Sequence, residues 1–139
     1  MDPGGNGQSC FDSCASLESV VFEGNTKIDD KNILGSLYNK ELPASSFANC
    51  SSLNTVILPS NINGLGSNAF NKCSSLKSIT LPSTVKRASK YSLAIGDMNI
   101  GDAEVIVQNE NSIVTIESTT FGMGANGINA IYVPDDFIA

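Results

Sequence analysis

Residues 47–59 read FANCSSLNTVILP, and residues 70–82 read FNKCSSLKSITLP. The two stretches start 23 residues apart and agree at Phe, Cys, Ser-Ser-Leu, a β-branched residue, Leu and Pro. A similar stretch, FDSCASLESVVFE, occupies residues 11–23, and a looser one, FGMGANGINAIYVP, occupies residues 121–134. The run EVIVQ at 104–108 fits the end of the same pattern. Self-similarity at a period of about 23 residues is typical of a repeat protein.

Each copy ends in a short alternation of apolar and polar residues, which predicts one strand per copy. A unit of this size cannot bury its own apolar face, but it can do so when stacked on further copies. We therefore predict a mainly β solenoid whose short parallel strands stack in about five coils of 23–26 residues. The β-branched position, expected to point inward, falls at Val20, Val56, Ile79, Val105 and Ile131.

The spacing of these positions also predicts the domain organisation. The interval between Val20 and Val56 is the longest, so we expect an insertion at residues 24–41. Residues 1–8 are rich in glycine and are expected to form a flexible leader. Residues 9–139 are then one solenoid domain.

Two further apolar series complete each coil. Ile62, Leu65 and Phe70 are spaced three and five residues apart, and the same gaps recur at 85, 88 and 93 and at 113, 116 and 121. The repeat Phe and Cys should stack on their equivalents in neighbouring coils. Cys50 and Cys73 share one repeat position with Cys14, so they could form a disulfide, but we favour buried, reduced thiols that act as small apolar groups.

Composition excludes several classes of function. The chain contains no His, which rules out Ser-His-Asp and Cys-His nucleophile pairs, Cys₂His₂ zinc sites and HExxH helices. The net charge of −6 argues against a nucleic-acid partner. No apolar run approaches the roughly 20 residues that span a bilayer, so we expect no membrane insertion. Residues 1–10 lack the features of a signal peptide.

Two motifs suggest ligands but lack the context that those ligands require. GMGANG at 122–127 matches a dinucleotide-binding pattern, yet a strand rather than a helix is expected to follow it. The stretch GDMNIGDAE at 96–104 offers Asp97, Asn99, Asp102 and Glu104, but without the spacing of a calcium-binding EF-hand loop. We therefore predict no catalytic residue, cofactor or metal, and we do not expect the protein to be an enzyme.

The central repeats also resemble a known family. The units SFANCSSLNTVILPSNI and AFNKCSSLKSITLPSTV look like BspA-like (treponemal-type) leucine-rich repeats, and the resemblance is strongest over residues 44–85. It extends to 9–23 and 113–134, and is weakest over 86–112. The resemblance implies a right-handed solenoid on secreted or cell-surface proteins, many of them bacterial, that serve in binding and adhesion. It supplies no catalytic residues.

Outward-facing strand residues should form two rows down the sheet. The first row is Ser19, Thr55, Ser78, Glu104 and Ala130, and the second row is Val21, Ile57, Thr80, Ile106 and Tyr132. The second row is mostly apolar or aromatic. This composition reflects either the preference of branched residues for strands or a recognition stripe.

These rows lead to our functional hypothesis of a non-enzymatic binding or adhesion module at the cell surface or outside the cell. It would bind a protein or a surface glycoconjugate through the second row together with Thr55, Ser78 and Glu104. The alternative is a structural spacer or stalk repeat with no ligand of its own. Self-association is the other interaction that an open-ended solenoid allows.

Overall fold

The computed structural model describes residues 11–22, 41–97, 101–108, 114–117, 119–122 and 128–133, which form strands and turns. Residues 1–8, Cys10, Asn99 and the insertion up to residue 40 lie outside these ranges. The strands in chain order are β1 (Ser19–Val21), β2 (Glu41–Leu42), β3 (Thr55–Ile57), β4 (Gly64–Leu65), β5 (Ser78–Leu81), β6 (Arg87–Ala88), β7 (Ala103–Val107), β8 (Thr115–Ile116) and β9 (Ile128–Tyr132).

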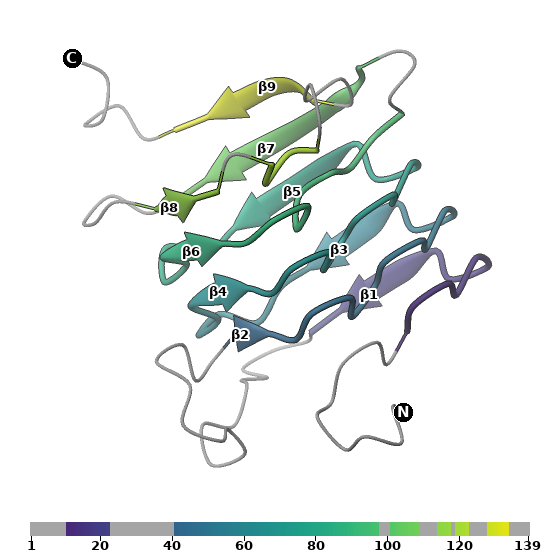
Figure 1. Ribbon diagram of the computed structural model, residues 1–139, viewed down its shortest axis with the longest axis horizontal. Helices are drawn as coiled ribbons and strands as arrows, with labels where there is room; N and C mark the ends of the chain where they lie inside the picture. The colour runs from purple at the N-terminus through teal and green to yellow at the C-terminus, as the bar shows by residue number, and fades with distance from the viewer. Residues whose placement is uncertain are drawn as a thin grey trace.

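The strands alternate between two sides of a flattened coil (Figure 1). Even-numbered strands form one parallel sheet in the order β2-β4-β6-β8, and odd-numbered strands form the parallel sheets β1-β3 and β5-β7-β9 on the other side. Each step between successive even strands is one complete turn, so the chain makes three turns from β2 to β8. The predicted mainly β solenoid of parallel strands is therefore confirmed.

The predicted register holds at three of its four steps. Val20 pairs with Val56, Ile79 pairs with Val105, and Val105 pairs with Ile131. At the remaining step β3 and β5 are neighbours, but no ladder joins them, so the sheet is not continuous. The prediction of about five coils was also too high, because the first and last copies contribute only β1 and β9 to the described residues.

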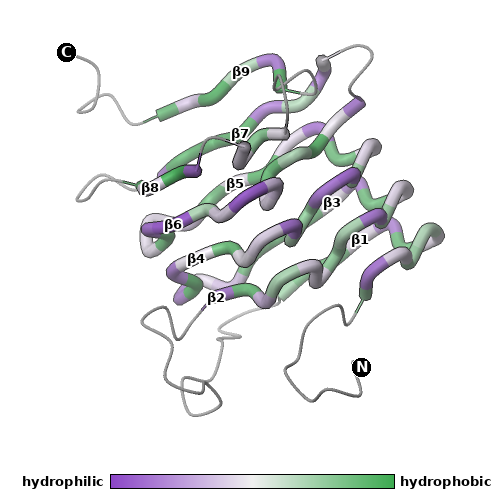
Figure 2. Tube along the Cα trace, in the orientation of Figure 1, coloured by the Kyte–Doolittle hydropathy of each residue, from purple (hydrophilic) through white to green (hydrophobic). Residues whose placement is uncertain are grey.

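Apolar side chains from both legs of each coil fill the space between the sheets. In Figure 2 the hydrophobic segments recur along the successive turns of the tube. The largest fully buried side chains are Leu53, Ile62, Leu65, Phe70, Leu76, Ile79, Leu81, Val85, Leu93, Ile95 and Val105. Removing this apolar surface from water is the main stabilising contribution to such a fold.

The turn that carries the repeat Phe holds successive coils together through rings and backbone. The rings of Phe11 and Phe47 stack with centroids 5.3 Å apart, and those of Phe47 and Phe70 stack at 5.5 Å. The Phe47 amide donates to the Ala69 carbonyl at 2.9 Å, and the Phe70 amide donates to the Ser92 carbonyl at 3.1 Å. The predicted stacking of the Phe position is confirmed.

The same turn depends on left-handed backbone that we did not predict from the sequence. Ser45, Asn68 and Tyr91 lie 23 residues apart, and each has a φ near +60°. Asn49 and Lys72, also 23 residues apart, share this conformation. Only glycine adopts it without strain. Because non-glycine residues occupy these positions, the sequence carries no glycine signal for the turn.

Two apolar positions predicted to lie in the core are exposed instead. Ile131 on β9 and Ile116 on β8 occupy inward repeat positions, but their exposed fractions are 46% and 52%. Their equivalents one coil earlier, Val105 and Ala88, are buried. The difference arises because β8 and β9 are the last strands of the described stack, where no further described coil covers them.

Candidate binding surface

The second predicted row lies on the outer face of the odd-numbered strands. Val21 pairs with Ile57, and Thr80, Ile106 and Tyr132 occupy one register across β5, β7 and β9. Ile57 is 53% exposed, Tyr132 is 51% exposed and Val21 is 43% exposed. Thr80 and Ile106 are only half-buried, so the expectation of uniform exposure is wrong in the centre of the row.

The first row lies beside it and is more polar. Ser19 pairs with Thr55, and Ser78, Glu104 and Ala130 share one register. Ser19, Thr55 and Ser78 are exposed, whereas Glu104 and Ala130 are half-buried. The alternation of side chains along each strand thus separates hydroxyl-bearing residues from apolar ones on the same face.

One polar contact links the two rows. The Tyr132 hydroxyl donates to Glu104 Oε1 at 3.4 Å, at an exposed position. This long hydrogen bond orients the tyrosine ring along the sheet and leaves half of its surface accessible. The face therefore combines a large amphipathic ring, branched apolar groups and hydroxyls, which are chemical groups suited to non-covalent contact rather than catalysis.

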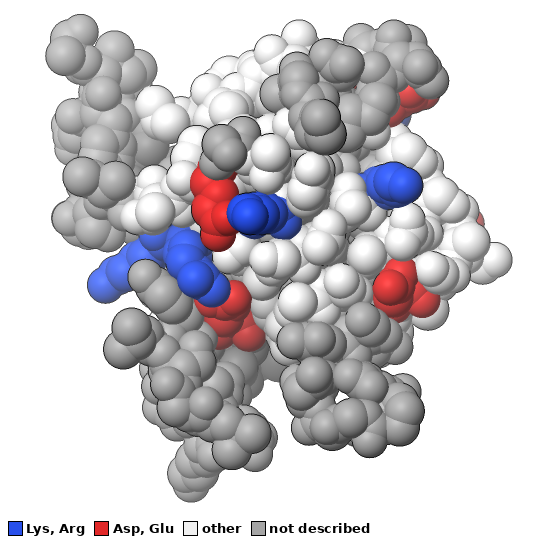
Figure 3. All heavy atoms as spheres, in the orientation of Figure 1, with Lys and Arg blue, Asp and Glu red and all other residues white. Residues whose placement is uncertain are grey.

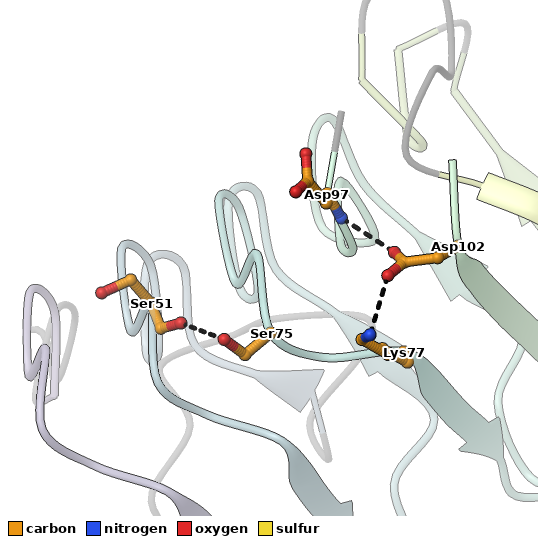
Figure 4. A network of polar contacts seen from close by, with 5 residues as sticks. All are labelled: Ser51, Ser75, Lys77, Asp97 and Asp102. Carbon is orange, nitrogen blue, oxygen red and sulfur yellow. Dashed lines mark hydrogen bonds and ion pairs between the residues drawn. The ribbon is translucent and has the colours of Figure 1, made fainter. Parts of the chain in front are cut away.

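The acidic loop that offered calcium-type oxygens is occupied by a lysine (Figure 4). Asp102 Oδ1 accepts a hydrogen bond from the Asp97 amide at 3.1 Å, and Lys77 Nζ lies 3.1 Å from Asp102 Oδ2. The Asp97 amide and the Lys77 ammonium both hold the pKa of Asp102 below its ordinary value. The ammonium group thus takes the place that a cation would need beside this carboxylate.

In the described ranges no three His, Cys, Asp or Glu side chains lie together as metal ligands would. GMGANG is described only at Gly122, and β9 follows the motif as a strand, which is the context expected from the sequence.

The cysteine position is a contact between coils. Cys50 and Cys73 are buried and free, and their Sγ atoms donate to the carbonyls of Phe11 and Phe47, each at 3.1 Å. Burial raises the pKa of Cys73 to about 12 and also raises the pKa of Cys50. The expectation of buried, reduced thiols is confirmed for these two residues, and the hydrogen bond to the preceding coil is an additional role that the sequence did not indicate.

The opposite face, on the even-numbered strands, carries a charged pair that sequence reasoning missed. Glu41, Gly64 and Arg87 share one register across β2, β4 and β6, and Arg87 Nη2 reaches the Glu41 carboxylate over Gly64. Figure 3 shows charged groups of both signs close together among uncharged atoms on the face that it displays. The only signal was the recurrence of these residues at 23-residue intervals.

The basic stretch Lys86, Arg87 and Lys90 does not form a separate anion site. Arg87 is engaged with Glu41, and the side chains of Lys86 and Lys90 are exposed. A membrane-spanning segment was also sought, and among the described residues no helix has the length and apolar character that crossing a bilayer requires.

Comparison with known proteins supports the family that the central repeats resemble. The sequence pattern of the BspA type leucine-rich repeat region matches residues 31–138 in six copies. It thus finds more copies than the four strand-forming units that we expected in that span, and the copy at 11–23 lies outside it. No curated protein and no solved structure matches the chain significantly. With repeats of this type matching most of its length and stacking as parallel coils, the chain belongs to the BspA-type leucine-rich repeat family.

Proposed function

We propose that the protein is a non-enzymatic binding or adhesion module, and that the outer face of β1, β3, β5, β7 and β9 is its partner-binding surface. The observation that carries this proposal is the alignment of exposed Val21, Ile57 and Tyr132 in one row. A solvated strand face does not need such large apolar groups, whereas the centre of a protein interface does.

The composition around this row favours a protein partner. Tyrosine gives a large contact area at low conformational cost, and hydroxyl groups supply adaptable hydrogen bonds. The neighbouring row provides these hydroxyls at Thr55 and Ser78, together with a carboxylate at Glu104. A surface glycoconjugate is a second partner class, because an aromatic ring beside hydroxyls and a carboxylate also suits a sugar.

The family association supports a location at the cell exterior. BspA-type repeats are associated with surface proteins, and leucine-rich repeats are generally non-catalytic. A module of this kind would work by burying partner surface against the strand face. Repeat proteins commonly use such extended faces for binding.

The alternative function is a structural spacer, and one observation favours it. Thr80 and Ile106 are half-buried, so the strongly exposed members of the row lie toward its two ends rather than in its centre. Branched residues such as Val21 and Ile57 also suit exposed strands by intrinsic preference. A spacer would therefore tolerate changes in this row with no loss of binding.

The test is a matched pair of double variants offered to an extract of bacterial cell-surface proteins and glycoconjugates. We expect immobilised wild type and a control, Ser83→Ala with Lys86→Ser, to retain the same components. Ile57→Ser with Tyr132→Ala should lose them while its circular dichroism stays unchanged. Protease or glycosidase treatment of the extract then separates the two partner classes. Equal retention by all three proteins would favour the spacer.

A further inference from the structure

The first described coil exposes positions that are buried in later coils. Phe11 is 48% exposed, although its equivalents Phe47 and Phe70 are buried. Its ring stacks on Phe47 on one side only. Leu17 is half-buried, whereas Leu53 at the same repeat position is completely buried. This end of the molecule therefore presents one half of the contact that successive coils make with each other.

The last described coil presents the other half. Ile131 on β9 is nearly half exposed, whereas Ile79 and Val105 in the same column are buried. Phe121 is half-buried, whereas Phe70 is completely buried. The column of inward residues and the column of repeat aromatic residues thus both end at this coil without a further described layer.

Both ends also have an open strand edge. The Phe22 amide donates to Ile57, so the alternation along β1 turns the amides of Ser19 and Val21 away from β3. On β9, one edge pairs with β7, and the other pairs with no described strand. An open parallel edge beside exposed apolar side chains is a template for another strand.

We propose that a second copy of this chain occupies these ends, so that copies stack head to tail. In this arrangement β1 of one copy lies beside β9 of the next, with Val20 opposite Ile131. The turn that contains Phe11 then covers the turn that contains Phe121. The occupant is a second copy because the contact repeats the one already formed between successive coils of this chain.

The contact is limited to the turn and the odd-numbered strands. Leu42 on β2, at the first edge of the even-numbered sheet, is already buried. Two different surfaces meet in this arrangement, so the contact is heterologous and does not close on itself unless the rotation between copies returns to the start. It is also distinct from the strand face proposed above for binding a partner.

Charge opposes this stacking and gives it a characteristic salt dependence. Asp12 and Glu18 lie on the first coil and Glu117 follows β8, whereas the described Lys and Arg residues all fall between Lys72 and Lys90. Two acidic ends repel each other, and dissolved salt screens this repulsion. Stacking should therefore strengthen as ionic strength rises, in contrast to docking between opposite charges.

The test is sedimentation velocity of the whole chain over a range of protein and salt concentrations. Wild type should form species larger than a monomer, increasingly so at high salt. Ser19→Pro removes an outward amide from β1, and Ile131→Glu places a charge on the β9 end. Each variant alone should fall to a monomer, while Ile57→Ser on the strand face should behave as wild type. Circular dichroism confirms that each variant is folded.

Mixing the two end variants gives the decisive result. Each keeps one intact end, so an equal mixture should form a one-to-one dimer and no larger species. A wild type that stays monomeric at every salt concentration would overturn the proposal. Association that is lost in Ile57→Ser but kept in both end variants would also overturn it, because the strand face would then be the contact.

Discussion

Arg87 and Glu41 lie two strands apart, yet Arg87 Nη2 is 2.8 Å and 2.7 Å from the two carboxylate oxygens of Glu41. The strand between them contributes Gly64 at the same register. A Cβ atom at Gly64 would come within 3.0 Å of Glu41 Oε2. The missing side chain therefore leaves the space in which one ion pair spans three strands.

The first prediction concerns this ion pair. A double-mutant cycle with Glu41→Gln and Arg87→Gln should give a coupling of about 1 kcal/mol in urea denaturation, because both side chains are only partly exposed. Gly64→Val should remove most of that coupling by displacing the glutamate. The coupling should shrink at high salt. A coupling of zero in low salt would show that the pair does not stabilise the stack.

The second prediction concerns two serines at one repeat position. Ser92 Oγ is buried with no hydrogen-bond partner, whereas Ser46 Oγ donates to the Pro43 carbonyl at 2.6 Å. Ser92→Ala should raise the free energy of unfolding by about 1 kcal/mol, because it removes an unsatisfied polar group. Ser46→Ala should lower it by about the same amount. Urea midpoints that shift in one direction for both variants would contradict this assignment.

A third prediction uses one leucine position in two coils. Leu76 is completely buried with coils on both sides, so Leu76→Ala should reduce stability by roughly 2–5 kcal/mol. Leu17 is only half-buried in the first coil, and Leu17→Ala should reduce stability by less. Chemical denaturation of both variants measures the difference. Equal losses would mean that the first coil is as well covered as the centre.

The fourth prediction concerns the buried thiol of Cys73. Burial raises its pKa from 9.0 to about 12, so the folded state retains a proton that the unfolded chain has already lost. The stabilising effect of the neutral thiol is therefore complete below pH 9 and declines as the pH rises toward 12. The slope should reach at most about 1.4 kcal/mol per pH unit.

Urea denaturation across this alkaline range measures that slope, and Cys73→Ala should make it shallower. Thiol labelling of the native protein should leave Cys50 and Cys73 unreacted, and denaturation should expose both. The same slope in Cys73→Ala would assign the pH dependence to other groups. A disulfide between Cys50 and Cys73, found by mass mapping, would refute the reduced state directly.

The strand positions could be predicted from the sequence because they repeat. Burial of one face forces Leu53 and Leu76 into the same column, and the 23-residue period then fixes which residues pair. The period also predicted the stacking of Phe47 and Phe70. It could not predict the break between β3 and β5, because Val56 and Ile79 match the pattern as well as the residues that do pair.

The candidate surface was predicted only in its arrangement. Alternation placed Ile57 and Tyr132 on the outer face, but it could not show that Thr80 and Ile106 would be half-buried by their neighbours. Ile131 matches the inward pattern and is exposed, since pattern alone does not indicate whether a coil lies above it. The link between Arg87 and Glu41 depends on side-chain reach, which a linear period does not encode.

The cysteine contact has a consequence for how the protein is assembled. Cys50, Cys73, Ser75, Thr84 and Thr120 each donate a side-chain hydrogen bond to a carbonyl of the preceding coil. The donors thus lie on the part of the chain that is synthesised later, and the acceptors on the part synthesised earlier. A coil that has just been translated can therefore dock on a finished one, so the structure can grow in the direction of synthesis, with each layer serving as a template for the next.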